Sequence, residues 1–122
     1  MVLTGIVLLV VSGMAATKLD HTKKRNLKVL PKDISDEKLD SLMQTYNKAL
    51  GVNCAFCHSP HASIKDSLDY ALDGNPMKEE GRKMIQLTID INKNYFHYDK
   101  TIPAAYLNAV TCITCHRGEP YP

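Results

Sequence analysis

All four cysteines of the chain lie in two five-residue motifs, CAFCH and CITCH. Two thiols three positions apart on a helical turn can reach the two vinyl groups of one porphyrin, and the histidine that follows then points at the iron. CxxCH is the signal for covalent attachment of c-type haem. We therefore predict two covalently bound haem c groups as cofactors. Their attachment and iron-binding residues are Cys54, Cys57 and His58 for the first haem, and Cys112, Cys115 and His116 for the second.

Two other uses of paired cysteines compete with haem. A four-thiolate zinc site usually has its CxxC pairs ~15 to 20 residues apart, whereas 54 residues lie between Cys57 and Cys112. Two disulfides in an exported protein would explain the cysteines but neither His58 nor His116. Both alternatives are much weaker than haem.

Each iron needs a second ligand opposite its histidine. A methionine thioether would raise the reduction potential and close the iron to substrate. Met43 and Met84 lie in the middle of apolar helical stripes, where a methionine can equally be core filler. His97, beyond the second predicted helix, is the main alternative ligand for the second haem. His61 lies in a loop and His21 in a basic segment, so we expect both to be solvated.

Two amphipathic helices must position these groups. The first is predicted over residues 35–50, with Ser35 as its N-cap and Gly51 as its stop. The second begins after the cap residue Asn75 and ends at residues 92–94. In both helices apolar residues recur at helical spacing along one face.

The other segments after residue 33 are predicted to be irregular. Residues 59–75 are rich in Ser, Asp and Pro and indicate a connecting loop. One short helical turn is expected around residues 104–108, and no strand pair is predicted. The fold class is therefore mainly α: a small dihaem cytochrome c domain of two helix-then-CxxCH units, preceded by an N-terminal apolar helix.

Charge and hydropathy divide the 122 residues into three segments. Residues 1–17 are apolar and indicate a signal peptide or a membrane anchor, although they are short for a membrane span. Residues 18–32 form a basic linker whose expected neighbour is a lipid surface. Its basic residues lack interleaved aromatics, which argues against nucleic acid as the partner. Residues 33–122 are the expected dihaem domain. Because haem attachment to CxxCH occurs outside the cytoplasmic membrane, we expect a periplasmic, membrane-anchored protein.

Four stretches resemble the cytochrome c subunit of photosynthetic reaction centres and its small dihaem relatives: NLKVLPKDIS, LMQTYNKALGVNCAFCH, GRKMIQLTIDINKNYF and VTCITCHRG. The resemblance covers nearly all of residues 26–120. In that family each such helix lies against a haem and supplies a methionine to its iron. The resemblance thus implies Met43 as a ligand of the first haem and Met84 as a ligand of the second. The reaction-centre subunit has four haem motifs, so this chain matches one half of that architecture.

With both axial positions filled, neither iron can bind a substrate, and the predicted function is electron transfer, not catalysis. We expect a membrane-tethered relay in a respiratory or photosynthetic chain, with redox partner proteins or a larger electron-transfer complex as its partners. The alternative is a dihaem peroxidase or a small-gas-binding haem protein with one open iron site. Arg117 is a candidate propionate contact or a solvated side chain. Gly81, one turn before Met84, either lets a porphyrin approach the helix or is a tolerated helix glycine.

Overall fold

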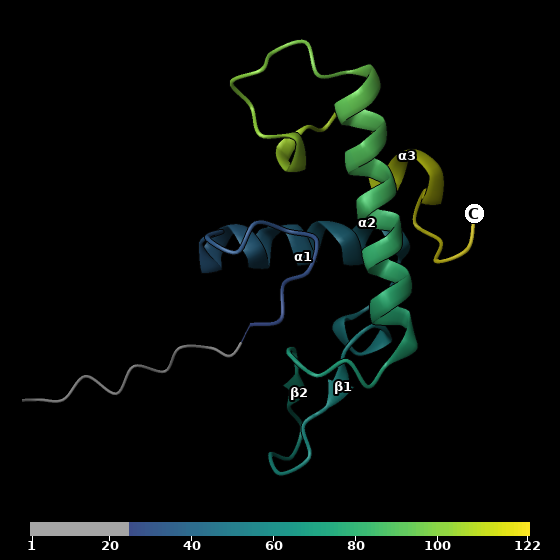
Figure 1. The fold of residues 1–122 in the computed structure, drawn as a ribbon. Coiled ribbons are helices and arrows are strands. Elements are labelled where there is room, and N and C mark those ends of the chain that lie inside the picture. Colours follow the sequence, from purple (N-terminus) through teal and green to yellow (C-terminus); the bar gives the residue numbers. More distant parts are fainter. Residues whose placement is uncertain (1–24) are drawn as a thin grey trace, which may run out of the picture.

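The computed structural model describes residues 25–122, and this part of the chain is mainly helical (Figure 1). The elements in chain order are helix α1 (Asp36–Leu50), 3₁₀ turn η1 (Cys54–Phe56), strands β1 (Ser59–Pro60) and β2 (Leu68–Asp69), helix α2 (Pro76–Tyr95), 3₁₀ turn η2 (Ala104–Tyr106) and helix α3 (Cys112–His116). The mainly α fold class is confirmed, whereas the N-terminal apolar helix predicted within residues 1–17 lies outside the described residues. No helix within residues 25–122 combines the length and the hydropathy needed to cross a bilayer.

Helix α1 begins and ends where its sequence predicts. The Ser35 hydroxyl accepts a hydrogen bond from the Lys38 amide at 3.2 Å, which satisfies one of the free donors in the first turn. Gly51 ends the helix with a left-handed φ of 65°, and its amide donates to the Asn47 carbonyl. A residue with a side chain reaches this φ only at a cost, so glycine sets the end of the helix.

Helix α2 starts at the predicted cap but runs further than predicted. The Asn75 Oδ1 atom accepts a hydrogen bond from the Met77 amide at 3.0 Å. The helix continues to Tyr95, whereas we expected it to end at residues 92–94. The difference is one residue, within the usual variation of helix ends; Asn92, read as a helix-ending residue, is buried inside the helix and bonded to a distant segment of the chain.

A minimal strand pair lies in the segment predicted as an irregular loop. Ser59 pairs with Asp69 and Pro60 with Leu68 in antiparallel register. Two residues per strand are too few to produce the alternating pattern that predicts a strand. The prediction of no strand pair was therefore wrong, although most of the segment is irregular.

The helices leave much apolar surface uncovered. Helix α1 lies across α2 (Figure 1) and packs mainly against α3, while α2 packs against η2 and α3. Among the described residues the buried apolar side chains are Leu30, Ile34 and Ala49. On α2, by contrast, Met84 and Leu87 are 43% and 50% exposed. The protein alone therefore supplies only a small core, and one apolar stripe of α2 has no protein cover.

Candidate haem sites

The first cysteine motif turns back against α1. The Asn53 side chain caps the turn by accepting from the Ala55 amide at 3.0 Å. From α1, the Asn47 Nδ2 atom donates to Cys54 Sγ at 3.4 Å. Met43, half buried, precedes Asn47 by one helical turn and so shares this edge of the helix. Cys54 therefore lies against the edge of α1 that also bears Met43.

His58 is half buried beneath the loop that follows β2. The His58 and Tyr70 rings meet edge to face with their centroids 5.0 Å apart. The His58 Nδ1 atom is buried and has no hydrogen-bond partner within residues 25–122. Burial, and then the positive charges of Lys78 and Arg82, lowers the pKa of His58. The imidazole is thus neutral at pH 7, which is the form that binds a metal.

The N-terminus of α2 is tied to the first motif. Asn75, whose Oδ1 atom caps this helix, also donates from Nδ2 to the Phe56 carbonyl at 3.0 Å. One side chain therefore fixes both the start of α2 and the turn that contains Cys54 and Cys57. Burial raises the pKa of the Cys57 thiol, so this thiol stays protonated at pH 7.

The second cysteine motif forms the single-turn helix α3. Thr111 and Thr114 close a capping box at its start. The His116 Nδ1 atom lies 3.0 Å from the Glu119 carbonyl oxygen. A hydrogen bond from Nδ1 to a backbone carbonyl orients a metal-binding histidine and leaves Nε2 for the metal. This contact therefore orients the His116 ring and leaves its Nε2 atom without a role in the bond.

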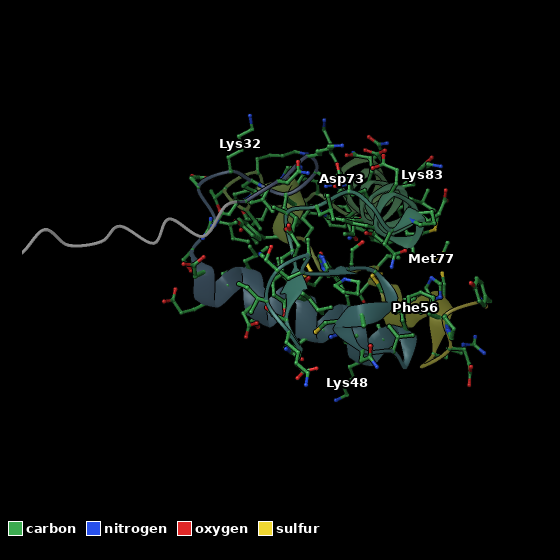
Figure 2. All side chains as sticks on the ribbon, turned by 90° about the horizontal axis from the view of Figure 1, so that it is seen from below. Lys32, Lys48, Phe56, Asp73, Met77 and Lys83 are labelled. Carbon is green, nitrogen blue, oxygen red and sulfur yellow. The ribbon has the colours of Figure 1, made fainter. Side chains whose placement is uncertain are left out.

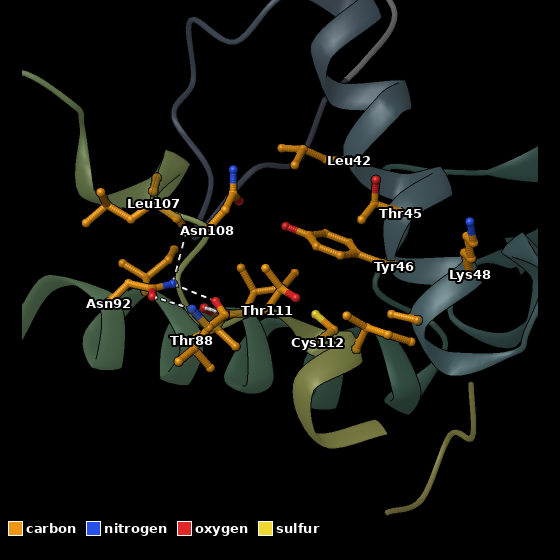
Figure 3. A pocket seen from close by; sticks show the side chains of 16 residues that line it. Leu42, Thr45, Tyr46, Lys48, Thr88, Asn92, Leu107, Asn108, Thr111 and Cys112 are labelled. Atoms are coloured by element: carbon orange, nitrogen blue, oxygen red, sulfur yellow. Dashed lines mark hydrogen bonds between the residues drawn. The ribbon is translucent and has the colours of Figure 1, made fainter. Parts of the chain in front are cut away.

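A cavity of about 310 Å³ lies beside Cys112, between α1, α2 and the segment that joins η2 to α3 (Figure 3). Tyr46 of α1 projects into this cavity with its hydroxyl toward Asn108, and Cys112 lies below its ring (Figure 3). Burial, and then the neighbouring Cys112, raises the pKa of Tyr46 to about 12, and burial also raises the pKa of Cys112. Helix α1 thus contributes to both sites, through Asn47 at the first motif and through Tyr46 at the second.

Asn92 holds the segment that leads into the second motif. Its Nδ2 atom donates to the carbonyls of Leu107 at 3.0 Å and Val110 at 2.7 Å, and its Oδ1 atom accepts from the Val110 amide at 2.8 Å (Figure 3). Sequence reasoning missed this role. The available signal was a polar side chain three residues after Ile89, on the apolar face of α2.

Not all predicted site residues are brought together. The cavity beside Cys112 is lined neither by Met84 nor by Cys115 or His116. Met84 instead lies on the uncovered stripe of α2. A Cβ atom added at Gly81, one turn earlier, would meet nothing within 4 Å. The space above this stripe is therefore open, and its apolar surface fits a large flat apolar group such as a porphyrin.

The rival histidine ligands have local partners. The His97 Nε2 atom lies 2.9 Å from the Ile102 carbonyl oxygen in its own loop. The His61 Nδ1 atom accepts from the amides of two loop residues that follow it, each at 3.1 Å. His21 lies outside the described residues. Arg117 is exposed and ends α3 with a φ of 54°.

The cysteines do not gather at one point. All four are free thiols in the structure. Within residues 25–122 no group of three or more His, Cys, Asp or Glu side chains is placed to hold a metal ion. Nothing in this part of the chain therefore supports the four-thiolate zinc site or the paired disulfides.

Comparison with known proteins identifies the family. The sequence model of the photosynthetic reaction centre cytochrome c subunit matches residues 61–122, half of the chain. The chain belongs to this family. The matched residues contain α2 and the second motif and begin just after the first motif. Membership of a cytochrome c family implies covalently bound haem c, which the two motifs and the uncovered apolar stripe of α2 fit.

Three curated relatives share about a third of their aligned residues with the chain. Cytochrome c-554 of Chloroflexus aurantiacus is 32% identical over 88 residues, which are 71% of this chain and 19% of that protein. The photosynthetic reaction center cytochrome c subunit of Roseobacter denitrificans is 32% identical over 99 residues, 80% of this chain and 24% of that protein. The subunit of the same name from Rubrivivax gelatinosus is 33% identical over 93 residues, 70% of this chain and 24% of that protein. The chain thus spans a quarter or less of the length of these relatives, and no solved structure matches it significantly.

Proposed function

We propose that the chain is an electron carrier with two covalently bound haem c groups, one at each CxxCH motif. The observation that carries the proposal is that α1 contacts both motifs. Its Asn47 side chain contacts Cys54, and its Tyr46 side chain lies in the cavity with Cys112. Residues 46 and 47 are neighbours on a helix that is about 10 Å across with its side chains, so groups attached at Cys54 and at Cys112 are near enough to exchange electrons.

The proposed iron ligands are His58 and Met43 at the first site, and His116 and Met84 at the second. Haem bound in this way supplies reversible one-electron chemistry. The role of the protein is to fill both axial positions of each iron, which excludes substrate. The chain would then act as an electron carrier and not as an enzyme. Arg117, which directly follows His116, is the proposed partner of a haem propionate.

We further propose that the carrier works on the periplasmic side of the membrane. Residues 1–17 would tether it, and the basic residues of 18–32 would face anionic lipid headgroups. Two of the relatives are named as reaction-centre subunits. A redox partner protein or a larger electron-transfer complex is accordingly the proposed partner.

An optical redox titration of purified full-length protein tests the proposal. Wild type should contain two covalently bound haems per chain. In Met84→Ala the second haem should lose the absorption band of sulfur-ligated ferric iron, and its potential should fall because a thioether ligand raises the potential. Met77→Ala is the matched control, since Met77 belongs to the same helix and is half buried.

Two results would contradict the proposal. Fewer than two haems per chain would refute the dihaem assignment. A Met84→Ala protein with the spectrum and potentials of Met77→Ala would refute the ligand assignment and leave His97 as the candidate for the second iron.

A further inference from the structure

The two proposed iron-binding histidines lie in different electrostatic surroundings. Lys78 and Arg82, in the first two turns of α2, are only 9% and 8% exposed. The Lys78 Nζ atom donates to the Tyr70 carbonyl at 3.0 Å, and the Tyr70 ring packs against the His58 ring. Two buried positive charges therefore lie close to His58, the proposed ligand of the first haem.

Carboxylates neutralise these charges only in part. Asp73 bonds to Lys78 and Arg82, each at 2.9 Å, and to Lys28 at 2.8 Å, while Glu79 pairs with Arg82 at 2.9 Å. The cluster thus contains three cations and two anions, and of the cations Lys28 is exposed, at 52%, whereas Lys78 and Arg82 are buried. The side chains of Asp73 and Glu79 are 36% and 56% exposed, so water screens them more than it screens the buried cations. Figure 2 shows Asp73 beside α2, which is seen nearly end-on.

Among residues 25–122 the buried cations are Lys78 and Arg82, whereas Arg117, which directly follows His116, is exposed. Among the side chains that line the cavity beside Cys112, Lys48 alone is charged, and it is exposed. In addition, the His116 Nδ1 atom is bonded to the Glu119 carbonyl, whereas the His58 Nδ1 atom has no hydrogen-bond partner within residues 25–122. A hydrogen bond of this kind makes an imidazole a stronger electron donor to a metal, and a stronger donor favours ferric iron.

We propose that Lys78 and Arg82 give the haem attached at Cys54 and Cys57 the higher reduction potential of the two. Reduction removes one positive charge from the site, so nearby cations favour the reduced form. The inference rests on the proposed dihaem function. It assigns a direction: one electron passes from the second site to the first, which oxidises the second and reduces the first, with no bond formed or broken and no proton transferred.

The test compares three variants of the full-length protein by redox titration. Arg82→Gln removes one buried charge, and Arg82→Lys keeps it. Lys83→Gln is the control and removes an exposed charge on the next residue. The Lys83 side chain is 59% exposed and paired with Glu80. We use Arg82 and not Lys78, because Lys78 donates to three backbone carbonyls and Arg82, among the described residues, only to that of Asn26. A fourth variant, Met43→His, shows which measured potential belongs to which haem, since it should lower the potential of the first haem only.

We expect the first haem to have the higher potential in wild type. In Arg82→Gln its ratio of reduced to oxidised form at a fixed ambient potential should fall about tenfold, which is about 59 mV for one electron. Arg82→Lys and Lys83→Gln should leave this ratio near that of wild type. Because the charge is buried, the shift should persist at high salt.

Several outcomes would overturn the inference. It is wrong if the second haem has the higher potential, if Arg82→Gln and Lys83→Gln shift the first haem equally, or if Arg82→Lys shifts it as much as Arg82→Gln. The last result would mean that the geometry of Arg82 matters and its charge does not. The haem content and the sulfur band of the same samples test the proposed function independently.

Discussion

Replacing Asn92 by alanine should loosen the segment that delivers the second motif. Asn92 is 2% exposed, and its three hydrogen bonds satisfy the carbonyls of Leu107 and Val110 and the amide of Val110. Each buried group left without a partner costs about 1–3 kcal/mol. Water can reach these groups through the neighbouring cavity, so the lower end of the range applies, and the three together amount to about 3 kcal/mol.

Chemical denaturation of the haem-bound protein measures this loss, and thermal unfolding provides a second readout. For a domain of this size, 1 kcal/mol corresponds to a Tm change of about 4–8 °C, so the Tm should fall by about 15 °C. Asn94→Ala is the control, because Asn94 lies two residues away on the same helix and is exposed. If the two variants unfold at the same denaturant concentration, Asn92 does not hold the 107–110 segment and the reasoning fails.

Two further predictions concern the backbone and acid stability. Gly51→Ala should destabilise the fold by more than about 2 kcal/mol in chemical denaturation. The φ of residue 51 is +65°, and a Cβ atom there would lie 2.0 Å from the Gly118 carbonyl oxygen. Gly74→Ala is the control and should destabilise less, because its Cβ atom would meet mainly movable side chains. Equal losses of unfolding free energy in the two variants would contradict the prediction. The hydrogen bonds from Arg82 above all, and then from Lys28 and Lys78, hold the pKa of Asp73 well below its usual range. The stabilisation by Asp73 is therefore complete above about pH 4 and is lost as the pH falls further. Below pH 4 the unfolding free energy of Asp73→Asn should decline less than that of wild type. Equal declines in the two proteins would exclude a stabilising role of the Asp73 carboxylate.

Features set by neighbouring residues were predictable from the sequence. The start and end of α1 depend on Ser35 and Gly51, which act within one helical turn. The cap at Asn75 is equally local. The spacing within each CxxCH motif needs no tertiary information, because it concerns a single turn of chain. These features followed from residue type and position alone.

Features set by residues far apart in the chain were missed. Arg82 donates to the Asn26 carbonyl 56 residues away at 3.0 Å, and Asn92 bonds to a segment 15 to 18 residues further on. Periodicity reports which face of a helix is apolar, but not which polar side chain on that face finds a partner. The buried cluster around Asp73 and the hydrogen bonds of Asn92 were therefore not predictable from pattern.

The ligand assignments of Met43 and Met84 remain predictions. Met43 shares the edge of α1 that reaches Cys54 through Asn47. Met84 lies on an open apolar stripe and does not line the Cys112 cavity. A haem lying over this stripe would cover Met84 and leave its sulfur against the iron, which is why the Met84→Ala titration is informative.

The two helix-then-CxxCH units are joined more closely than their sequence suggests. Helix α1, which bears Met43, packs against α3, and the Gly118 amide donates to the Ala49 carbonyl at 2.9 Å. Helix α2, which bears Met84, is tied by its cap to the Phe56 carbonyl of the first motif. Each helix that carries a proposed ligand is thus fixed to the attachment motif of the other haem. A half-chain cut within residues 59–75 would lose both contacts, so we expect the two proposed sites to fold together.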